Sequence, residues 1–322
     1  MNIRRRLEEI VVRFEKIHVC VVGDVMLDQY LFGDEELLRS EQGSIPLMRI
    51  QKECAYAGGA ANPAMNAAVL GAQVTLIGAC GKDHAGDTLI RILSDAGIEI
   101  SSILIRDVCP TIQKIRIIGF RPVMRIDKEK ICQLSKEERE QVIRFFRKGI
   151  RTWHAVVVSD YAKGFFSALL TREFVRISRD AHIPLYVDVR PAHFSFFRGA
   201  RMFTPNVREA EAILGHRLSN QKDIQDAIKK LAHISKSSVM ITQGARGMTF
   251  LDGHAVKHLS SLAREVVEDT GAGDTVLVVY TLAHIAGASV DDAALLANIA
   301  AGIVVGKPGT ATLSQDELIA AL

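Results

Sequence analysis

Short apolar runs alternate with amphipathic segments along most of the chain. The apolar runs, such as QVTLIGACG at 73–81, are rich in β-branched residues and end at glycine or aspartate, as buried strands do. The segments between them, such as HAGDTLIRILSDAGI at 84–98, repeat apolar residues at helical spacing. This alternation predicts an α/β fold in which helices cover both faces of a mostly parallel sheet. Ligands of such sheets bind beyond the carboxyl ends of the strands.

The same patterns assign the individual elements. Strands are predicted within 18–23, 73–81, 154–164, 183–191, 201–204 and 237–247, with a hairpin at 248–260. Helices are predicted at the N-terminus, within 60–72, 84–98, 134–150, 167–181, 206–214 and 221–234, and after residue 271.

Two further segments have the character of exposed β-structure. Residues 29–59 are mixed and irregular, with short alternating pieces, whereas residues 111–130 alternate as a hairpin does. No linker rich in Pro, Gly or Ser divides the chain, and no internal repeat is visible. We therefore predict one domain, residues 1–322, with a small β lid formed by about 29–57 and 110–128.

Composition narrows the class of protein. Of the 322 residues, 48% are hydrophobic and 24% are charged, and the net charge of +3 comes from scattered Lys and Arg rather than from the basic stripe of a nucleic-acid-binding protein. The longest apolar run is too short, and too interrupted by His284, to span a bilayer, and the N-terminus lacks the apolar core of a signal peptide. We expect a cytoplasmic protein with no nucleic-acid or membrane partner.

The cysteines and histidines lack the spacing of a metal site. The cysteines are Cys20, Cys54, Cys80, Cys109 and Cys132. No two of them have C-x-x-C spacing, and the ten histidines are dispersed without an H-E-x-x-H motif. A disulfide framework is therefore not expected, and reduced thiols are the simpler interpretation.

Candidate chemistry begins with EDTGAGDT at 268–275, a glycine turn that leads into an apolar helix. Consecutive amides at a helix N-terminus, here those of Gly271, Ala272 and Gly273, form an anion site that the helix dipole reinforces. Asp274 would repel a resting anion. If the anion is a phosphoryl group in transfer, however, Asp274 can accept the proton of the attacking hydroxyl. The alternative is a plain glycine turn with a capping aspartate.

Two known glycine-rich nucleotide motifs are absent from the sequence. Neither CGKDH nor VVGKPG has the spacing or the hydroxyl residue of G-x-x-x-x-G-K-[ST], and the turn at 271–273 lacks the third glycine of the dinucleotide fingerprint, which disfavours a dinucleotide-dependent oxidoreductase. YAGGAANPAMNAAVLG places Gly58 and Gly59 before a helix that carries Asn62. These glycines permit close backbone approach, and Asn62 offers a donor and an acceptor to a sugar hydroxyl. Tight helix packing through small residues explains the same stretch.

The two glycine-rich stretches together resemble the paired signatures of the ribokinase-like (phosphofructokinase-B type) sugar kinases. GGAANPAMNAAVLG lies near the N-terminal third and DTGAGDT near the C-terminus, and the resemblance covers nearly the whole chain. It implies a three-layer ribokinase-like α/β fold with a β lid and ATP-dependent transfer to a sugar hydroxyl. It also implies that Asp274 is the base and that the amides of Gly271, Ala272 and Gly273 form the anion hole.

The resemblance gives roles to residues that would otherwise be plain caps or turns. GDVMLD resembles the first sugar-binding turn and places Asp28 on substrate hydroxyls. TPNVREAE resembles the N-x-x-E element, so Asn206 and Glu209 would help to organise the phosphates and Mg²⁺, the latter through water. TQGARG resembles the nucleotide-binding turn and LANIAAG the adenine contact, which together implicate Thr242, Gly244, Gly247 and Asn298.

Several stretches narrow the resemblance to the heptose 7-phosphate kinases of lipopolysaccharide core synthesis. They are VVGDVMLDQYLFGD, PTIQKIRI, MRIDKE, VVVSDYAKGF and GIVVGKPGTATLSQDEL. This implies phosphorylation of the C1 hydroxyl of D-glycero-β-D-manno-heptose 7-phosphate. The substrate-binding candidates are the cations Lys114, Arg116, Arg125 and Arg39 for the phosphate, with Asp127, Asp160 and Lys163 beside the sugar. A solvated hairpin face is the alternative explanation for the lid charges.

Departures from the family pattern bear on ions and substrate. Glu268, followed by Asp269, replaces an aspartate that supports a monovalent-cation site in some members, so K⁺ activation is left open. VDVRP retains Asp188 but has Arg190 in place of lysine, and RSEQGSIPL at 39–47 differs from the stretch that borders the sugar. Another sugar, such as fructose 1-phosphate or ribose, therefore stays an alternative, as does a catalytically silent sugar- or nucleotide-binding homologue.

Two expectations concern assembly. Exposed lid strands need to be covered, and family members often pair their lids, so we predict a homodimer through the β lid. Some relatives are fused to an adenylyltransferase domain, whereas this chain ends with the kinase-like region. We therefore expect a stand-alone kinase or one half of a longer enzyme.

Overall fold

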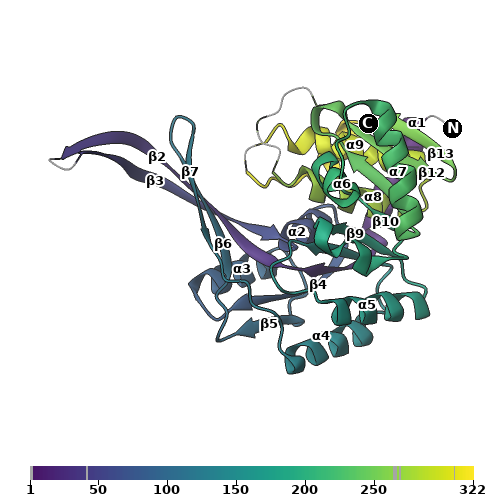
Figure 1. Cartoon of the computed structure of the whole chain (residues 1–322), viewed down its shortest axis with the longest axis horizontal. Coiled ribbons are helices and arrows are strands. Elements are labelled where there is room, and N and C mark those ends of the chain that lie inside the picture. Colours follow the sequence, from purple (N-terminus) through teal and green to yellow (C-terminus); the bar gives the residue numbers. More distant parts are fainter. Residues whose placement is uncertain (1–2, 41–42, 264–266, 268–269, 308) are drawn as a thin grey trace.

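The computed structural model describes residues 3–40, 43–263, 267, 270–307 and 309–322, and it describes no side chains within 37–46. The strands in this part of the chain form a large sheet in the body of the molecule and a second sheet that projects from it (Figure 1). In spatial order the large sheet contains β13 (Ala255–Leu259), β12 (Met248–Asp252), β11 (Ser238–Thr242), β10 (Met202–Phe203), β9 (Leu185–Val189), β8 (Ala155–Asp160), β1 (His18–Gly23), β4 (Gln73–Gly81) and β5 (Ile103–Arg106).

Neighbouring strands from β11 to β5 are parallel, whereas β12 and β13 form an antiparallel hairpin at one edge. One face is covered by α1 (Ile3–Val12), α2 (Ala61–Val69), α3 (His84–Asp95), α8 (Ala272–Ile285), α9 (Val290–Val304) and α10 (Gln315–Ala320). The other is covered by α4 (Lys136–Gly149), α5 (Ala168–Asp180), α6 (Val207–Leu214) and α7 (Gln221–Ser235). Short 3₁₀ turns are η1 (Arg13–Lys16), η2 (Pro191–Phe197) and η3 (Gly244–Arg246). The predicted three-layer arrangement is present.

The alternation within a strand explains the two apolar layers. In β1, Val19 and Val21 belong to the core under one helical layer, while Cys20 and Val22 belong to the core under the other. Because both faces of β1 are buried, its sequence is continuously apolar rather than alternating. β5 was not predicted, since its four residues are too few to show a period.

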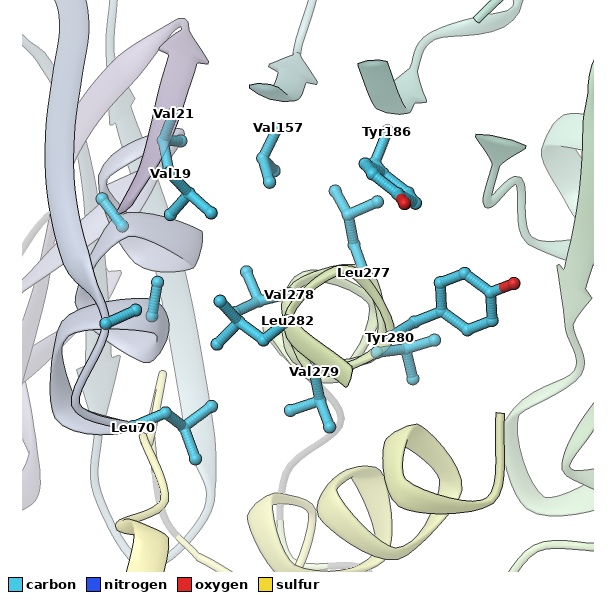
Figure 2. Close-up of a cluster of buried hydrophobic side chains, with 14 of the residues drawn as sticks. Val19, Val21, Leu70, Val157, Tyr186, Leu277, Val278, Val279, Tyr280 and Leu282 are labelled. Atoms are coloured by element: carbon cyan, nitrogen blue, oxygen red, sulfur yellow. The ribbon is translucent and has the colours of Figure 1, made fainter. Parts of the chain in front are cut away.

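Helix α8, which follows the predicted glycine turn, is enclosed by the protein on all sides. All its residues from Asp274 to Ala283 are buried. Figure 2 shows this helix end-on, with Leu277 directed toward Val157 and Tyr186 of the sheet and Val279 directed away from the sheet. A helix that is apolar on every side has to lie inside the protein, and this burial holds the N-terminal end of α8 in a fixed place at the sheet.

The second sheet contains β3 (Gly43–Gly59), β2 (Val25–Ser40), β6 (Ile112–Ile118) and β7 (Pro122–Lys128), in that order. The segments predicted as a lid lie in this sheet, whose hairpins extend away from the body (Figure 1). The β-structure predicted for 29–59, outside the main sheet, is present, but as two long strands, β2 and β3, rather than as short alternating pieces. A register shift between Phe32 and Gly33 interrupts the alternation, which made one long strand resemble several short ones.

The cysteine prediction was wrong for one pair. Cys109 and Cys132 are joined by a disulfide across 23 residues, while Cys20, Cys54 and Cys80 are free. The bonded residues flank β6 and β7, so the bridge closes the base of this hairpin. Sequence spacing could not reveal the pair, because only the return of the hairpin brings the two residues together. No helix in the described ranges is long and apolar enough to cross a membrane.

Candidate active site

A cavity of about 160 Å³ lies at the carboxyl edge of the parallel strands, beside the N-terminus of α8. Asp160 ends β8, Val189 ends β9 and Asn206 follows β10, so the parallel sheet brings these residues to one edge. The lining residues are Asp160, Tyr161, Asp188, Val189, Arg190, Asn206, Glu209, Gly271, Gly273 and Asp274. The expected position beyond the strand ends is therefore where residues of the glycine turn and of the N-x-x-E element meet.

The glycine turn forms the first turn of α8. Gly271 is the N-cap residue at φ +85°, and a Cβ there would lie 2.8 Å from the amide nitrogen of Asn62. The N–H of Thr275 donates to the carbonyl of Gly271, so the N–H groups of Ala272, Gly273 and Asp274 precede the helical hydrogen-bond ladder. A cradle of this kind, together with the helix dipole, suits a phosphoryl oxygen.

The two carboxylate oxygens of Asp274 have different surroundings. Oδ2 accepts a hydrogen bond from Asn62 Nδ2 at 2.8 Å and another from the Tyr161 hydroxyl at 3.4 Å. Oδ1 is buried and has no hydrogen-bond partner within the described part of the chain. Because each acceptor bond lowers the basicity of the oxygen that receives it, the unpartnered Oδ1 is the stronger proton acceptor.

Burial raises the pKa of Asp274 to about 7, and the hydrogen bonds from Asn62 and Tyr161 act against this rise. The negative charge of Asp28 adds to the rise, while Arg190 opposes it. A carboxylate whose pKa lies near neutrality is matched to general-base work at that pH. Asn62 was expected to face a sugar hydroxyl, and the structure gives its amide nitrogen to Asp274 instead.

Carboxylates crowd the cavity beside Asp274. Burial raises the pKa of Asp188, and the negative charges of Glu209 and Asp274 add to this effect. Arg190 is the one cation lining this described cavity, and its Nη1 donates to Glu209 Oε1 at 3.1 Å. The guanidinium also lies 5.2 Å from the ring centre of Tyr161. Such an excess of negative charge favours the binding of a cation.

Asn206 and Glu209 form a reciprocal capping box at the start of α6. Asn206 Oδ1 accepts from the N–H of Glu209, and Glu209 Oε2 accepts from the N–H of Asn206, both at 3.0 Å. Both residues line the cavity. No three His, Cys, Asp or Glu side chains in the described ranges are grouped to hold a metal by themselves. Mg²⁺ fits only as an ion that completes its oxygen shell with phosphate and water.

The inner face of the second sheet carries most of the predicted sugar contacts. Register places Asp28 beside Lys114 and Tyr30 beside Arg116, so these side chains share one face. Arg116 Nη1 donates to Asp28 Oδ1 at 3.1 Å, and both side chains are largely buried. Burial raises the pKa of Asp28, an effect that Arg116 opposes, and burial lowers the pKa of Lys114. Gly58 makes room here, because a Cβ would lie 2.5 Å from Asp28 Oδ2.

The remaining predicted sugar-binding residues have partners inside the protein. Arg125 donates two hydrogen bonds to Asp127, at 2.8 and 2.7 Å. Lys163 Nζ lies 2.6 Å from Glu129 Oε1. Asp160 Oδ2 lies 2.6 Å from His193 Nδ1, while its Oδ1 accepts from the N–H of Ala162. The side chain of Arg39, and residues Glu268 and Asp269 of the possible K⁺ site, lie outside what the structure describes.

Asp24 connects the second sheet with the loop that follows β8. It stands between β1 and β2, and its carbonyl accepts from the N–H of Ala60 at the exit of β3. Its carboxylate accepts from the N–H groups of Tyr161, Lys163 and Phe165 at 2.9 to 3.1 Å. Burial raises the pKa of Asp24 to about 6, although these amides act against the rise. Gly59, at φ +56°, allows the close approach, since a Cβ would lie 2.2 Å from the Asp24 carbonyl oxygen.

The other predicted nucleotide residues, Thr242, Gly244, Gly247 and Asn298, do not line the cavity. Thr242 ends β11 and pairs with Asn206 in an isolated bridge. Gly244 and Gly247 have φ values of +58° and +90° in the turn that follows, and a Cβ on Gly247 would clash with the carbonyl oxygen of Leu259. Asn298 of α9 is buried and donates to the carbonyl of Ser260 at 2.7 Å, so its side chain ties α9 to the segment after β13.

Sequence reasoning did not assign roles to Tyr161, Asn66 or Asp188. Tyr161 lies in SDYAKG and Asp188 in VDVRP, both of which end strands at the cavity edge, so the strand-end rule could have selected them. Asn66 follows Asn62 by four residues on α2, and helical spacing alone places both side chains on one face.

Comparison with known proteins places this geometry in a family. Residues 16–317 match the pfkB family of carbohydrate kinases, and the chain belongs to this family. A bifunctional protein HldE from Pasteurella multocida (strain Pm70) is 37% identical over 307 residues, which are 95% of this chain and 63% of that protein. The HldE of Geobacter metallireducens is 34% identical over 322 residues, 99% of this chain and 66% of that protein. The chain thus spans about 63% of the length of the first of these relatives.

Solved structures have the same fold. Arabidopsis thaliana ribokinase, complexed with ribose and ATP, has a TM-score of 0.75 at 20% identity, with 95% of this chain and 98% of that chain covered. Escherichia coli phosphofructokinase-2, in complex with potassium, has a TM-score of 0.76 at 17% identity, with 94% and 96% covered. The predicted ribokinase-like fold is confirmed, as is the predicted enzyme class of ATP-dependent carbohydrate kinase.

Proposed function

We propose that the chain transfers the γ-phosphoryl group of ATP to the C1 hydroxyl of D-glycero-β-D-manno-heptose 7-phosphate, in ADP-heptose and lipopolysaccharide core biosynthesis. The single observation that carries the chemistry is Asp274 at the N-terminus of α8. It is a buried carboxylate with one oxygen held by two donors and the other without a partner in the described residues. Support for the heptose comes from the stretches that resemble heptose 7-phosphate kinases and from the HldE relatives.

In this proposal Asp274 takes the proton of the C1 hydroxyl as its oxygen attacks the γ-phosphorus. The bond to the β-phosphate oxygen breaks, and ADP leaves. The amides of Gly271, Ala272 and Gly273 stabilise the negative charge that develops on the transferred phosphoryl group. Arg190 lies at the same cavity and contributes a positive charge.

We propose that Asn206, Glu209 and Asp188 lie nearest to Mg²⁺, with water and phosphate oxygens completing its shell. Bound there, the ion supplies positive charge to the phosphate oxygens. The excess of carboxylates in the cavity supports this placement. Thr242, Gly244, Gly247 and Asn298 are retained as the proposed nucleotide side of the site. K⁺ activation is not proposed.

The substrate phosphate is proposed to bind on the inner lid face. Lys114 and Arg116 share that face with Asp28, and the partly buried Lys114 has no ion pair in the described structure to satisfy its charge. Asp28 is proposed to bind sugar hydroxyls, with Gly58 and Gly59 leaving space beside it. The pairs that Arg125 forms with Asp127 and Lys163 forms with Glu129 would open or rearrange when the sugar phosphate binds.

We further propose that the second sheet acts as the lid of a single kinase domain and pairs with a second copy of the chain. The outer face of this sheet carries Ile115 and Ile117 opposite Ile126 and Met124. Met124 and Ile126 are 58% and 39% exposed, which is unfavourable unless another surface covers them. A homodimer through the lid would cover them.

The test is ADP release from Mg²⁺–ATP with a sugar panel, measured for the wild type and for Asp274→Asn. The panel contains heptose 7-phosphate, fructose 1-phosphate, fructose 6-phosphate and ribose. Turnover confined to heptose 7-phosphate, and reduced at least ~10²-fold in the variant, is the expected result. Turnover on another sugar would retain the mechanism and reject the substrate. ATP binding without turnover on any sugar would favour a catalytically silent homologue. Arg116, Arg125 and Lys163 are already paired with carboxylates inside the protein, which is compatible with that alternative.

A further inference from the structure

The amide of Asn66 lies one helical turn after Asn62 on α2, fully buried and outside the residues that line the cavity. We propose that Asn66 is a positioning residue which, through Asn62, keeps Asp274 ionised and selects the oxygen that accepts the proton. This inference rests on the proposed role of Asp274 as base, and it adds a residue that no motif assigns to the reaction.

A backbone carbonyl sets the direction of the chain of hydrogen bonds. The carbonyl oxygen of Asn62 can only accept, and it lies 3.1 Å from the side-chain nitrogen of Asn66. That contact fixes the orientation of the Asn66 amide, so its Oδ1 faces the Thr275 hydroxyl, 3.3 Å away. The same Asn66 nitrogen lies 3.2 Å from Asn62 Oδ1 and donates to it.

The orientation of Asn62 follows from this contact. Because its Oδ1 accepts from Asn66, its Nδ2 is the end that faces Asp274, at 2.8 Å from Oδ2. A reversed Asn62 would turn its oxygen toward Asp274. Two oxygen atoms at that distance are held together only by a shared proton, which would have to sit on the carboxyl group. The reversed state therefore favours a protonated Asp274, which cannot act as a base.

The correct orientation also distinguishes the two oxygens of Asp274. Asn62 and Tyr161 both donate to Oδ2, and Oδ1 is left without a donor in the described structure. The hydroxyl proton of the sugar is then directed to Oδ1. Asn66 itself touches neither the phosphoryl group nor the sugar in this scheme, so its effect is exerted through Asn62.

The experiment measures kcat/KM against pH, from about 5.5 to 9.5, for Asn66→Leu and Asn66→Ala. Leu removes the donor at similar size, and Ala suits the alanine-rich helix if Leu does not fold. The matched control is Thr281→Val, which removes a buried hydroxyl that bonds within α8, away from the site. We expect the acid limb to move up by one pH unit or more in both Asn66 variants, with at least about a fivefold loss at pH 7, recovery at alkaline pH and an unchanged KM for ATP. The control should keep the wild-type midpoint.

A uniform loss at every pH, with the wild-type midpoint, would show that Asn66 serves packing alone and would overturn the inference. Asp274→Asn separates the two levels of the argument. If that variant turns over at the wild-type rate, the base assignment fails and this inference fails with it. If it is inactive while the Asn66 variants keep the wild-type midpoint, only the positioning role is rejected.

A readout without catalysis gives a second test. Urea unfolding of Asn66→Ala across the same pH range reports the pKa of Asp274 through its linkage to stability. In the wild type the free energy of unfolding falls as the pH rises, until Asp274 is fully ionised in the folded protein, and then stays constant. The pH at which it becomes constant should be higher in Asn66→Ala than in the wild type. An unmoved curve would reject the inference even if activity were lost for another reason.

Discussion

Replacing Asp274 by asparagine should make the folded protein more stable while it removes the activity. Burial raises the pKa of Asp274 from 3.8 to about 7, so the folded state resists the ionisation that the unfolded chain undergoes freely. Below about pH 4 the carboxyl group is protonated in both states and this penalty is absent. The penalty grows as the pH rises from about 4 to 7 and is complete above about 7.

The size of the effect follows from the pKa shift. A shift of about 3 units corresponds to about 4 kcal/mol at pH 8, which is an upper bound for the stabilisation. The asparagine can accept from Asn62 as Asp274 does, but its amide nitrogen then occupies the place of Oδ1 and lacks an acceptor. Leaving that donor unpaired costs about 1–3 kcal/mol. The net gain is therefore about 1–3 kcal/mol, or roughly 2–4 °C in Tm for a chain of 322 residues.

Urea unfolding at pH 5 and pH 8 measures this difference, because the gain should be larger at pH 8. Asp292→Asn is the control. Asp292 is also a buried aspartate of this helical layer, but it pairs with Arg6 at 2.8 Å, so its replacement should lower the free energy of unfolding. If Asp274→Asn is less stable than the wild type at pH 8, or if its effect is the same at both pH values, the account of Asp274 as a strained buried base is wrong.

Three other outcomes rest on separate contacts. Arg116→Ala removes the buried partner of Asp28 and should raise the KM for the sugar phosphate at least ~10-fold, with an unchanged KM for ATP. The control, Arg49→Ala, lies in an exposed ion pair of the same sheet and should change neither KM. Equal effects of the two substitutions would contradict the proposed role of the lid. Cys109→Ser removes the disulfide and should lower the free energy of unfolding in urea by about 3 kcal/mol, whereas Cys54→Ser, at a free cysteine, should lower it by much less. Similar losses in the two variants would show that closing the loop does not stabilise the protein. In the wild type, kcat/KM should fall about tenfold per pH unit below about pH 7, where a flat profile would exclude the buried carboxylate as base.

The sequence predicted those parts of the molecule that local pattern determines. Apolar runs and helical spacing located most strands and helices of the body, because both faces of the sheet are buried and the periods are clear. The sequence also predicted the glycine turn before Asp274, because the left-handed backbone conformation of Gly271 favours glycine at that position. The lid hairpin at 111–130 also followed from its alternation.

Contacts between distant residues were beyond the sequence patterns. Asn62 and Asp274 are separated by 212 positions, and nothing near either residue indicates that one donates to the other. The disulfide of Cys109 and Cys132 depends on the return of a hairpin that no spacing rule describes. The length of β2 and β3 was hidden by the register shift beside Gly33, which moves the pattern to the opposite face midway along the strand.

The carboxylate of Asp24 gives the kinase a mechanical linkage. It stands at the joint between the body and the lid, and it holds the backbone of the loop that carries Tyr161. Tyr161 donates from its backbone to Asp24 and from its hydroxyl to Asp274, so a single residue connects this joint to the cavity. A change at Asp24 should therefore disturb the second sheet and the surroundings of Asp274 together.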